Sequence, residues 1–241
     1  MSTLMNTTHP HLKKYALAVA IAASGLLAPS LGFALTPFSA SYDFNLDNKA
    51  SGSATRTLTK KSNQQWSYQF TAKVPVVASA SESSVFSLDN QQNITSQGYS
   101  RQYKILGISQ NSSISFNPAN KLVNTTKDKT KRQFAWENGA LDDLNAELQV
   151  REDLKKGKLQ SSYPIASLKE ITDRQFVNEG AVKVTVPSGT YDTIKVRLKH
   201  KKNDKSTVFW LAPSLDYLPV QMSHQDDGST YTLKLKSYSA R

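Results

Sequence analysis

Cysteine is absent from this 241-residue sequence. Its absence excludes a disulfide framework, thiolate metal sites, a cysteine nucleophile and a lipid-modified N-terminal cysteine. Any stable fold must therefore come from packing alone, and the hydrophobic share of 38% is adequate for a packed core.

Long hydrophobic runs are also scarce, and only one near the N-terminus stands out. Two lysines precede an apolar stretch at 15–27, which is followed by Gly-Phe-Ala at 32–34. This pattern is typical of a secretory signal peptide, and the stretch is shorter than the roughly 20 residues that a membrane span needs. We predict that residues 1–34 are a signal peptide cleaved near Ala34, with a retained anchor as the less favoured alternative. The mature chain, 35–241, is then a single periplasmic domain without a membrane-spanning segment.

Acidic residues are few compared with basic ones. The chain has 30 Lys and Arg against 19 Asp and Glu, a formal net charge of +11, and without the two lysines of the signal peptide the net is 28 − 19 = +9. In the periplasm a basic protein meets acidic lipid headgroups, acidic glycans or acidic protein patches. We therefore predict no nucleic-acid partner, and the alternative explanation is that the charge keeps the protein soluble.

The common catalytic motifs are missing as well. The sequence has no Gly-x-Ser-x-Gly elbow, no Ser-x-x-Lys pair and no glycine-rich phosphate loop. Adjacent carboxylates occur at 142–143 and 226–227, but neighbours on a helix or turn point apart. Helix-dipole and turn preferences explain these carboxylates better than acid–base catalysis does. We predict that the protein is not an enzyme and uses no cofactor.

Histidine is rare, and only His200 and His224 lie outside the N-terminal segment. Both continue an alternating apolar series, so each is expected on the inward side of a strand end. If the two strands are neighbours, the imidazoles form a pair able to bind metal or to titrate near neutral pH. Two histidines without a third ligand are a weak metal signal, and rim histidines in contact with water explain them equally well. We predict no metal site.

Alternation of apolar and polar residues dominates the sequence after residue 35, and it predicts antiparallel strands with one wet face. The apolar positions of the clearest strands are Phe38/Ala40/Tyr42/Phe44/Leu46, Trp66/Tyr68/Phe70/Ala72, Val182/Val184/Val186, Ile194/Val196/Leu198, Leu218/Val220/Met222 and Tyr231/Leu233/Leu235. Between 75 and 136 the alternation is weaker, with Phe86/Leu88 and Ile114/Phe116 as its strand signals.

Turn residues connect the strands in the last part of the chain. Pro-Ser-Gly-Thr at 187–190 and Asp-Asp-Gly-Ser at 226–229 both place glycine where a tight turn needs positive φ. A lysine-rich loop at 199–205 separates two further strands. The last sixty or so residues are thus predicted to form a meander of about four or five strands.

The segment 138–157 follows a helical spacing instead. Leu141, Leu144 and Leu148 fall on one face, acidic residues come first, lysines come last, and Gly157 follows as a cap. These features predict a helix of about four turns. Because its apolar stripe is narrow, we expect the helix at the edge or mouth of the sheet and not buried inside.

The strand Val208–Ala212 is apolar on both faces, with Phe209 and Leu211 on one side and Trp210 on the other. Both sides of such a strand must be covered. A helix or loop is the simplest cover, and a second sheet layer, a bound apolar ligand or a partner protein are the alternatives. The next segment, Ser214–Tyr217, is predicted to be a connecting turn because the flanking prolines lack amide donors.

Four segments resemble a known family. They are Leu141-Asp-Asp-Leu-Asn-Ala-Glu-Leu148, Val186-Pro-Ser-Gly-Thr-Tyr-Asp-Thr-Ile-Lys-Val196, Phe209-Trp-Leu-Ala-Pro-Ser-Leu-Asp-Tyr-Leu-Pro-Val220 and Asp227-Gly-Ser-Thr-Tyr-Thr-Leu-Lys-Leu235. With them the chain resembles the bacterial envelope family catalogued as domain of unknown function 3108. The resemblance covers nearly the whole mature chain and is specific from about Gly180 onward. It implies an exported, β-rich protein with no assigned activity.

The fold that we predict is mainly β: a single antiparallel sheet of about ten strands, curved or partly closed as a half-barrel, with one α-helix packed on its open side. By analogy with lipoprotein-carrier folds, such a half-barrel holds an acyl chain in its concave face. The leading hypothesis is a non-enzymatic periplasmic protein that binds an apolar or anionic amphiphile, such as a lipid or a lipopolysaccharide-like molecule. The alternative is a docking module for another envelope protein.

The predicted ligand contacts come from the aromatic strand and the loops beside it. They are Phe209, Trp210, Leu211 and Tyr217 for the apolar part and Lys199, Lys201 and Lys202 for the headgroup. A second basic cluster at 127–132 is another candidate for contact with an anionic surface. Solvated hairpin tips that discourage edge pairing are the alternative explanation of both lysine clusters.

Overall fold

The described structure covers residues 35–62, 64–200 and 204–241 of a computed structural model. The chain divides into two units, 1–32 and 33–241. The predicted signal peptide, 1–34, lies outside the described residues, and so do Lys201 and Lys202. Within the described ranges, no helix is long and apolar enough to cross a bilayer.

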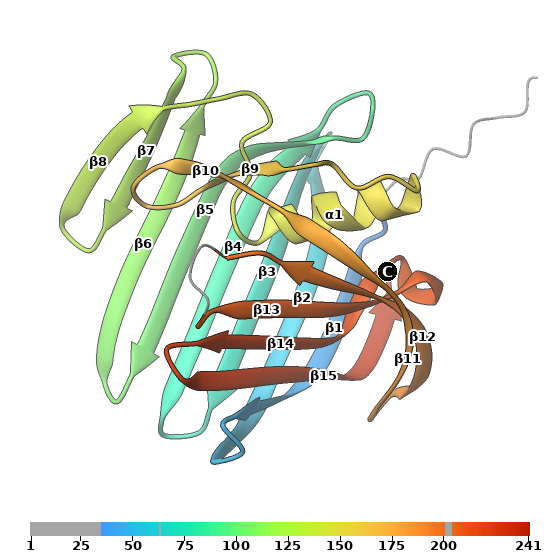
Figure 1. Cartoon of the computed structure of the whole chain (residues 1–241). Coiled ribbons are helices and arrows are strands. Elements are labelled where there is room, and N and C mark those ends of the chain that lie inside the picture. The colour runs from blue at the N-terminus through green and yellow to red at the C-terminus, as the bar shows by residue number, and fades with distance from the viewer. Residues whose placement is uncertain (1–34, 63, 201–203) are drawn as a thin grey trace, which may run out of the picture. The chain divides into compact units, whose positions relative to one another are not determined.

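Thirteen strands form one antiparallel sheet (Figure 1). Its first eight strands are β1 (Phe38–Leu46), β2 (Ala50–Ser62), β3 (Gln65–Val74), β4 (Ala78–Leu88), β5 (Ile94–Ile105), β6 (Ile108–Asn117), β7 (Leu122–Lys127) and β8 (Thr130–Ala135). The other five are β11 (Phe176–Val186), β12 (Gly189–Leu198), β13 (Ser206–Ala212), β14 (Leu218–Asp226) and β15 (Ser229–Ala240). The strand order is β11-β12-β13-β14-β15-β1-β2-β3-β4-β5-β6-β7-β8, so the first and last strands of the chain meet inside the sheet.

The sheet is not closed, because β8 and β11 are its two edges. The chain between these edges forms α1 (Asn145–Lys155) and a small separate sheet of β9 (Tyr163–Ala166) and β10 (Ile171–Arg174). Leu141, just before the helix, forms a parallel bridge with Ile165 of β9. Figure 1 shows α1 and β9 lying across the concave side of the first strands.

The helix is buried, and the expectation that it would lie unburied at the edge or mouth is wrong. Every residue from Asn145 to Leu154 is buried, including six whose side chains are charged or carry an amide. The helix begins later than predicted, at Asn145, and runs for 11 residues. Most of its polar side chains have partners on the surrounding strands or loops, and Glu152 pairs with Lys155 of the helix itself, so a narrow apolar stripe did not keep the helix at the surface.

The predicted strands are confirmed. Buried side chains follow the expected alternation, for example Phe38, Ala40 and Tyr42 in β1 and Val196 and Leu198 in β12. The meander of the last part is confirmed as β11 to β15, with turns at the two predicted glycines. The weakly alternating middle forms β4 to β8, which raises the strand number above the predicted ten.

The described part of the chain is therefore mainly β, as predicted: a large, open antiparallel sheet with one α-helix on its open side. A short 3₁₀ helix, η1 (Pro213–Leu215), joins β13 to β14, where a connecting turn was expected. The turn then passes through Asp216 and Tyr217, both with positive φ.

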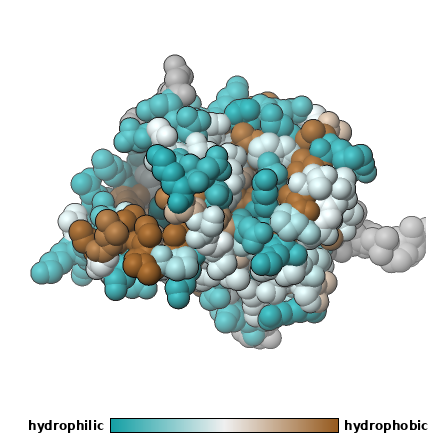
Figure 2. All heavy atoms as spheres, turned by 90° about the horizontal axis from the view of Figure 1, so that it is seen from below, coloured by the Kyte–Doolittle hydropathy of each residue, from teal (hydrophilic) through white to brown (hydrophobic). Residues whose placement is uncertain are grey.

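Apolar side chains are exposed at one end of the sheet. They occupy the turns between β3 and β4 and between β5 and β6: Val76, Val77, Ile105, Leu106 and Ile108. Figure 2 views the molecule from below and shows a group of hydrophobic residues at its left, among hydrophilic neighbours. Turns with this many exposed apolar groups are unusual, because turn positions normally carry polar residues or glycine.

Candidate functional site

A buried ion pair fixes the helix to the sheet. Glu147 of α1 pairs with Arg56 of β2, and both side chains are almost fully buried. The hydroxyl of Tyr68 on β3 accepts a hydrogen bond from Arg56 Nη1 (2.8 Å) and donates one to Glu147 Oε1 (2.9 Å). Because a buried charge is costly unless it is paired and hydrogen-bonded, the three residues act as one unit.

Aromatic and sulfur groups surround the Arg56 guanidinium. Its central carbon lies 5.2 Å from the ring centroid of Phe70, and Nη2 donates to the sulfur of Met222 on β14 at 3.6 Å. Arg56 Nε has no hydrogen-bond partner among the described residues. Burial raises the pKa of Tyr68 to about 12, against the opposing effect of the nearby Arg56 charge. The phenol therefore stays protonated and remains a donor to Glu147.

The main cavity opens above this cluster, between the two halves of the sheet. Its volume is about 450 Å³. Strands β2 to β5 form one wall, β12 to β15 form the other, and the start of α1 forms the floor. The side chains that line it are Arg56, Phe70, Glu82, Tyr99, Arg101, Asp143, Leu144, Glu147, Arg174, Leu198, His200, Lys205, Thr207, Phe209, Met222, His224, Asp226, Ser229 and Tyr231.

The charges of this lining occur in pairs. Arg101 lies 3.5 Å from Glu82, and Arg174 lies 3.5 Å from Asp143. Lys205 pairs with Asp226 at 2.7 Å, and the fourth pair is the buried one described above. Burial raises the pKa of Glu82, and the nearby charge of Arg101 partly offsets this rise. The cavity therefore offers matched charges of both signs, with three of its cations near the rim.

Part of the opposite wall is apolar. Phe209 and Met222 face each other across β13 and β14, and Leu198 and Tyr231 continue the same surface. Burial raises the pKa of the Tyr231 hydroxyl to about 12, so that this side chain is neutral. The same wall also carries the Lys205–Asp226 pair and the two histidines near the ends of its strands, so paired charges adjoin the apolar surface on both sides of the cavity.

The two histidines lie close together at the rim. Their ring centroids are 6.2 Å apart, and both bind the hydroxyl of Thr207, at 2.8 Å from His200 Nε2 and 2.7 Å from His224 Nδ1. Burial, with the nearby Lys205 charge, lowers the pKa of His200 to about 4 and shifts that of His224 in the same direction. Both are therefore neutral near pH 7. No group of three potential metal ligands occurs among the described side chains.

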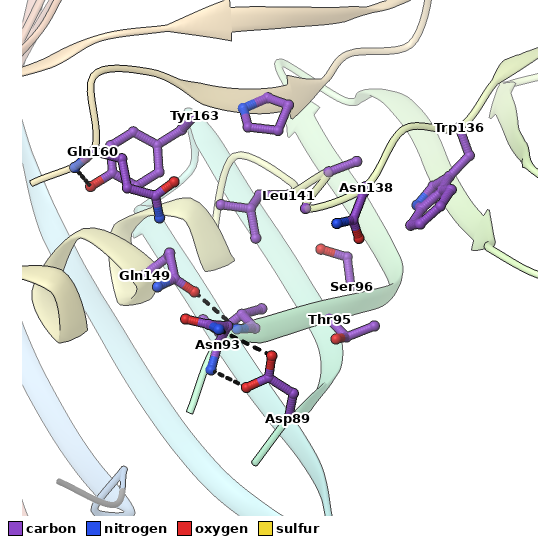
Figure 3. Close-up of a pocket in the computed structure, with 14 residues that line it drawn as sticks. Asp89, Asn93, Thr95, Ser96, Trp136, Asn138, Leu141, Gln149, Gln160 and Tyr163 are labelled. Carbon is purple, nitrogen blue, oxygen red and sulfur yellow. Dashed lines mark hydrogen bonds between the residues drawn. The ribbon is translucent and has the colours of Figure 1, made fainter. Parts of the chain in front are cut away.

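A second cavity, of about 360 Å³, lies on the opposite face of the helix (Figure 3). Here Gln149 Oε1 accepts the amide of Ile94 at 2.9 Å, and the Asn93 side chain donates to Asp89 at 3.0 Å. Elsewhere on its rim, Gln160 and Tyr163 both donate to Asp153 of the helix. These polar groups bind one another, so this cavity is better explained as a seam that holds α1 between β5 and β9.

Among the predicted ligand contacts, Phe209 alone lines the main cavity within the described residues. Leu211 is buried in the core, and Trp210 lies on the other face of β13, where its strand neighbours are Lys195 and Gln221. Tyr217 is partly buried in the turn before β14, and Lys199 is exposed at the end of β12. The residues predicted as one contact surface therefore do not lie together.

Sequence reasoning missed the charged side chains of the cavity. Arg56 stands at an inward position of an alternating strand, between Ala54 and Leu58, which are both buried. Glu147 likewise stands three residues after the buried Leu144, on the same face of the helical pattern. A charge of each sign at an apolar position was the signal that pointed to a buried pair.

The sequence matches the model of the family described as "Protein of unknown function (DUF3108)" over residues 38–236. The chain belongs to this family. The match confirms the resemblance seen in the sequence. No curated protein matches the chain.

One solved structure with a similar fold is a beta-barrel-like protein of domain of unknown function DUF1849 from Brucella abortus. The TM-score is 0.57 at 9% sequence identity, and the match covers 86% of this chain and 98% of the other. At this identity the likeness concerns the fold alone.

Proposed function

We propose that this DUF3108 protein is a non-enzymatic protein of the periplasm that binds an amphiphile in the main cavity. The observation that carries the proposal is the lining itself, in which an apolar surface around Phe209 and Met222 adjoins paired charges on both sides of the cavity. Ligand sites are typically concave and mostly apolar, with a few placed polar groups. A periplasmic location is supported by the signal-peptide pattern of the sequence.

The apolar part of the ligand lies along Phe209, Met222 and Phe70 in this proposal. An acidic headgroup meets the rim cations Arg101 and Lys205, whose side chains keep 48% and 32% of their exposure. Each of these cations is exposed enough to meet the headgroup while it keeps its carboxylate partner. The proposal replaces the predicted contacts Trp210 and Leu211 as ligand groups.

Native mass spectrometry of the protein purified from its own cells tests this function. The wild-type protein is expected to carry an amphiphile, and Met222→Trp is expected to lose it because the indole fills the cavity. Gln221→Trp is the matched control, since Gln221 lies opposite Trp210 on the other face of the same strands. A wild-type protein without bound amphiphile would contradict the proposal, and one stoichiometric protein partner in its place would favour the docking module.

A further inference from the structure

The turns between β3 and β4 and between β5 and β6 form one continuous apolar surface, which we call the apolar tip. It consists of Val76, Val77, Ile105, Leu106 and Ile108. The Leu106 amide donates to the Val77 carbonyl at 2.9 Å, and Ala78 stands opposite Ile105, so the two turns are neighbours. Val76 is fully exposed and Leu106 is 76% exposed. Exposed apolar surface of this extent marks a site of interaction.

The backbone of the apolar tip shows that its apolar residues occupy unfavourable positions. Val76 has φ of 66° and Leu106 has φ of 47°, in the region that favours glycine and asparagine. At Val76, the amide of Val77 donates to the carbonyl of Pro75 at 2.8 Å, which closes a three-residue turn of a rare and strained type. The other described non-glycine residues with positive φ are polar or tyrosine: Asp47, Asn48, Gln92, Lys121, Asp128, Asp216, Tyr217 and Asp227.

Glycine or asparagine would reduce the backbone strain at Val76 and Leu106. The presence of valine and leucine there points to a role for their side chains. The chain places Val and Leu at the outermost positions of two neighbouring turns, where polar residues fold more easily. The apolar character of these two positions is therefore best explained by contact with an apolar environment.

Positive charge flanks the apolar tip. Lys73 and Lys104 are exposed, and both stand opposite Ser79 of the strand between them, one residue inside the turns. The sequence has no acidic residue from 48 to 81 and none from 90 to 127. An apolar end with a basic collar matches a bilayer that carries anionic headgroups, because the apolar groups enter the interface while the lysines stay at the headgroups.

The apolar tip lies beyond the cavity along the same strands. Glu82 and Arg101, which line the cavity, are paired in register, and the strands continue from them through Ala78 and Ile105 to the turns. Glu82 and Val76 are six positions apart in the sequence, which corresponds to about 20 Å along an extended strand. A protein anchored by the apolar tip thus holds its cavity a short distance above the bilayer.

We infer that the apolar tip inserts into the interface of an anionic phospholipid bilayer. The insertion is peripheral, since it uses two turns, and it depends on both the apolar tip and the flanking lysines. This membrane contact goes beyond the proposed ligand binding and does not require the cavity to hold a ligand.

Flotation with lipid vesicles tests the inference. The wild-type protein is expected to bind vesicles of phosphatidylethanolamine with phosphatidylglycerol, and to bind neutral phosphatidylcholine vesicles more weakly. Added salt should weaken the anionic binding. The double variant Val76→Asn with Leu106→Asn is expected to lose roughly tenfold in binding for each side chain removed. Because asparagine tolerates positive φ better than valine and leucine do, this variant should fold as well as the wild type does.

Val182→Asn is the matched control. Val182 is also an exposed valine, at 40%, but it lies on the edge strand β11 away from the apolar tip. It should bind vesicles as the wild type does. A wild-type protein that binds neither vesicle, or a double variant that binds as tightly as the wild type, would overturn the inference. The inference would also be overturned if sedimentation velocity showed a dimer of the wild type and of Val182→Asn but a monomer of the double variant, because the apolar tip would then join two copies of the chain.

The two proposals can fail separately. The double variant should retain any amphiphile that native mass spectrometry finds in the wild type, since none of the tip residues lines the cavity. Conversely, Met222→Trp should keep its vesicle binding. Loss of both properties in the double variant would contradict the independence of the apolar tip from the cavity.

Discussion

The buried pair of Arg56 and Glu147 connects a helix with few apolar residues to the middle of the sheet. Removing one member leaves the other charge buried without its partner, which costs more than the pair itself contributes. The helix position therefore depends on two single residues that lie 91 positions apart in sequence.

Replacing Glu147 by leucine is expected to lower the free energy of unfolding by about 3–5 kcal/mol. The double variant Arg56→Met with Glu147→Leu should recover a large part of this loss, because no charge is then left unpaired. Urea unfolding of the wild type, of Glu147→Leu, of Arg56→Met and of the double variant measures the coupling. As a control, Asp192→Asn removes the exposed pair with Lys183 and should cost less than about 1 kcal/mol. Equal losses in the single and double variants would contradict the argument.

Asp142 predicts a pH dependence. Burial raises its pKa from 3.8 to about 7 in the folded protein, although hydrogen bonds from Ser84 and from the amides of Asn145 and Leu144 act in the opposite direction. Between these two pH values the folded state keeps a proton that the unfolded state has lost. The free energy of unfolding therefore falls as pH rises through this window.

Asp142→Asn should remove this fall, because the amide oxygen still accepts from the two backbone amides and does not titrate. The measurement is urea unfolding at pH 5 and pH 8 for both proteins. The wild type should lose more stability than the variant does between these values. The pKa values of His200 and His224 are lowered, in the direction opposite to that of Asp142. Both histidines are present in both proteins, so their contribution cancels when the two changes in stability are compared. An equal change in both proteins would show that Asp142 is not responsible.

Among single residues, the inward positions were predictable and their partners were not. Alternation alone places Tyr42, Tyr68 and Phe209 on the inner face. It does not say that Arg56 meets Glu147 or that His200 and His224 share Thr207, because these pairs depend on which strands become neighbours. The sequence prediction names both Trp210 and Phe209 as ligand contacts because both are aromatic, although their side chains lie on opposite faces of the strand.

At the scale of elements, the turn at Leu106 carries a stability cost. Leu106 and Gly107 both have positive φ, which is the arrangement that asparagine followed by glycine favours. Leu106→Asn is expected to raise the free energy of unfolding by about 1 kcal/mol. Thermal unfolding measures the change, and Lys104→Asn in the adjacent strand is the control that should bring no gain. A lower melting temperature for Leu106→Asn would show that the turn is not strained.

Gly52 in β2 marks a close approach between β2 and β3. A Cβ atom at this position would lie 2.1 Å from the Lys73 carbonyl oxygen, whereas one at Gly98 would meet nothing closer than 3.7 Å. Gly52→Ala should therefore cost about 1–3 kcal/mol, as other forced overpacking does. Gly98→Ala should leave stability nearly unchanged. Chemical unfolding of both variants distinguishes these outcomes, and a neutral Gly52→Ala would contradict the close contact.

The helix shows why element boundaries are harder to predict than element types. Asp142 Oδ1 accepts the amides of Leu144 and Asn145, and the Asn145 side chain accepts the Asp142 amide. Asp142 therefore lies before the helix as a capping group and not within its first turn. Helical spacing predicted the segment, while the capping hydrogen bonds decided where it begins.

For the whole molecule, the class and the openness of the sheet followed from alternation, turns and the family resemblance. The strand order did not, because each strand offers the same ladder of donors and acceptors to many others. The burial of α1 also depended on the complete sheet, which supplies partners to the helix from both sides.

The position of β1 between β15 and β2 predicts a gradient of protection. Amide hydrogens of β1 should exchange more slowly in hydrogen–deuterium exchange than those of strands near the edges, since β1 lies near the middle of the sheet and pairs on both sides. Those of the edge strands β8 and β11 should exchange fastest among the strands. The reverse order, with β1 exchanging early, would contradict the pairing of the first and last strands.

The seam between β1 and β15 also affects the order in which the protein folds. Ser41 and Ser237 join their side chains across it although 196 positions separate them, and the amide of Arg241 donates to Pro37. Bringing such distant segments together is slow compared with forming a hairpin. Each half of the sheet can assemble from local hairpins, but the two halves can join only after the last strand has left the ribosome.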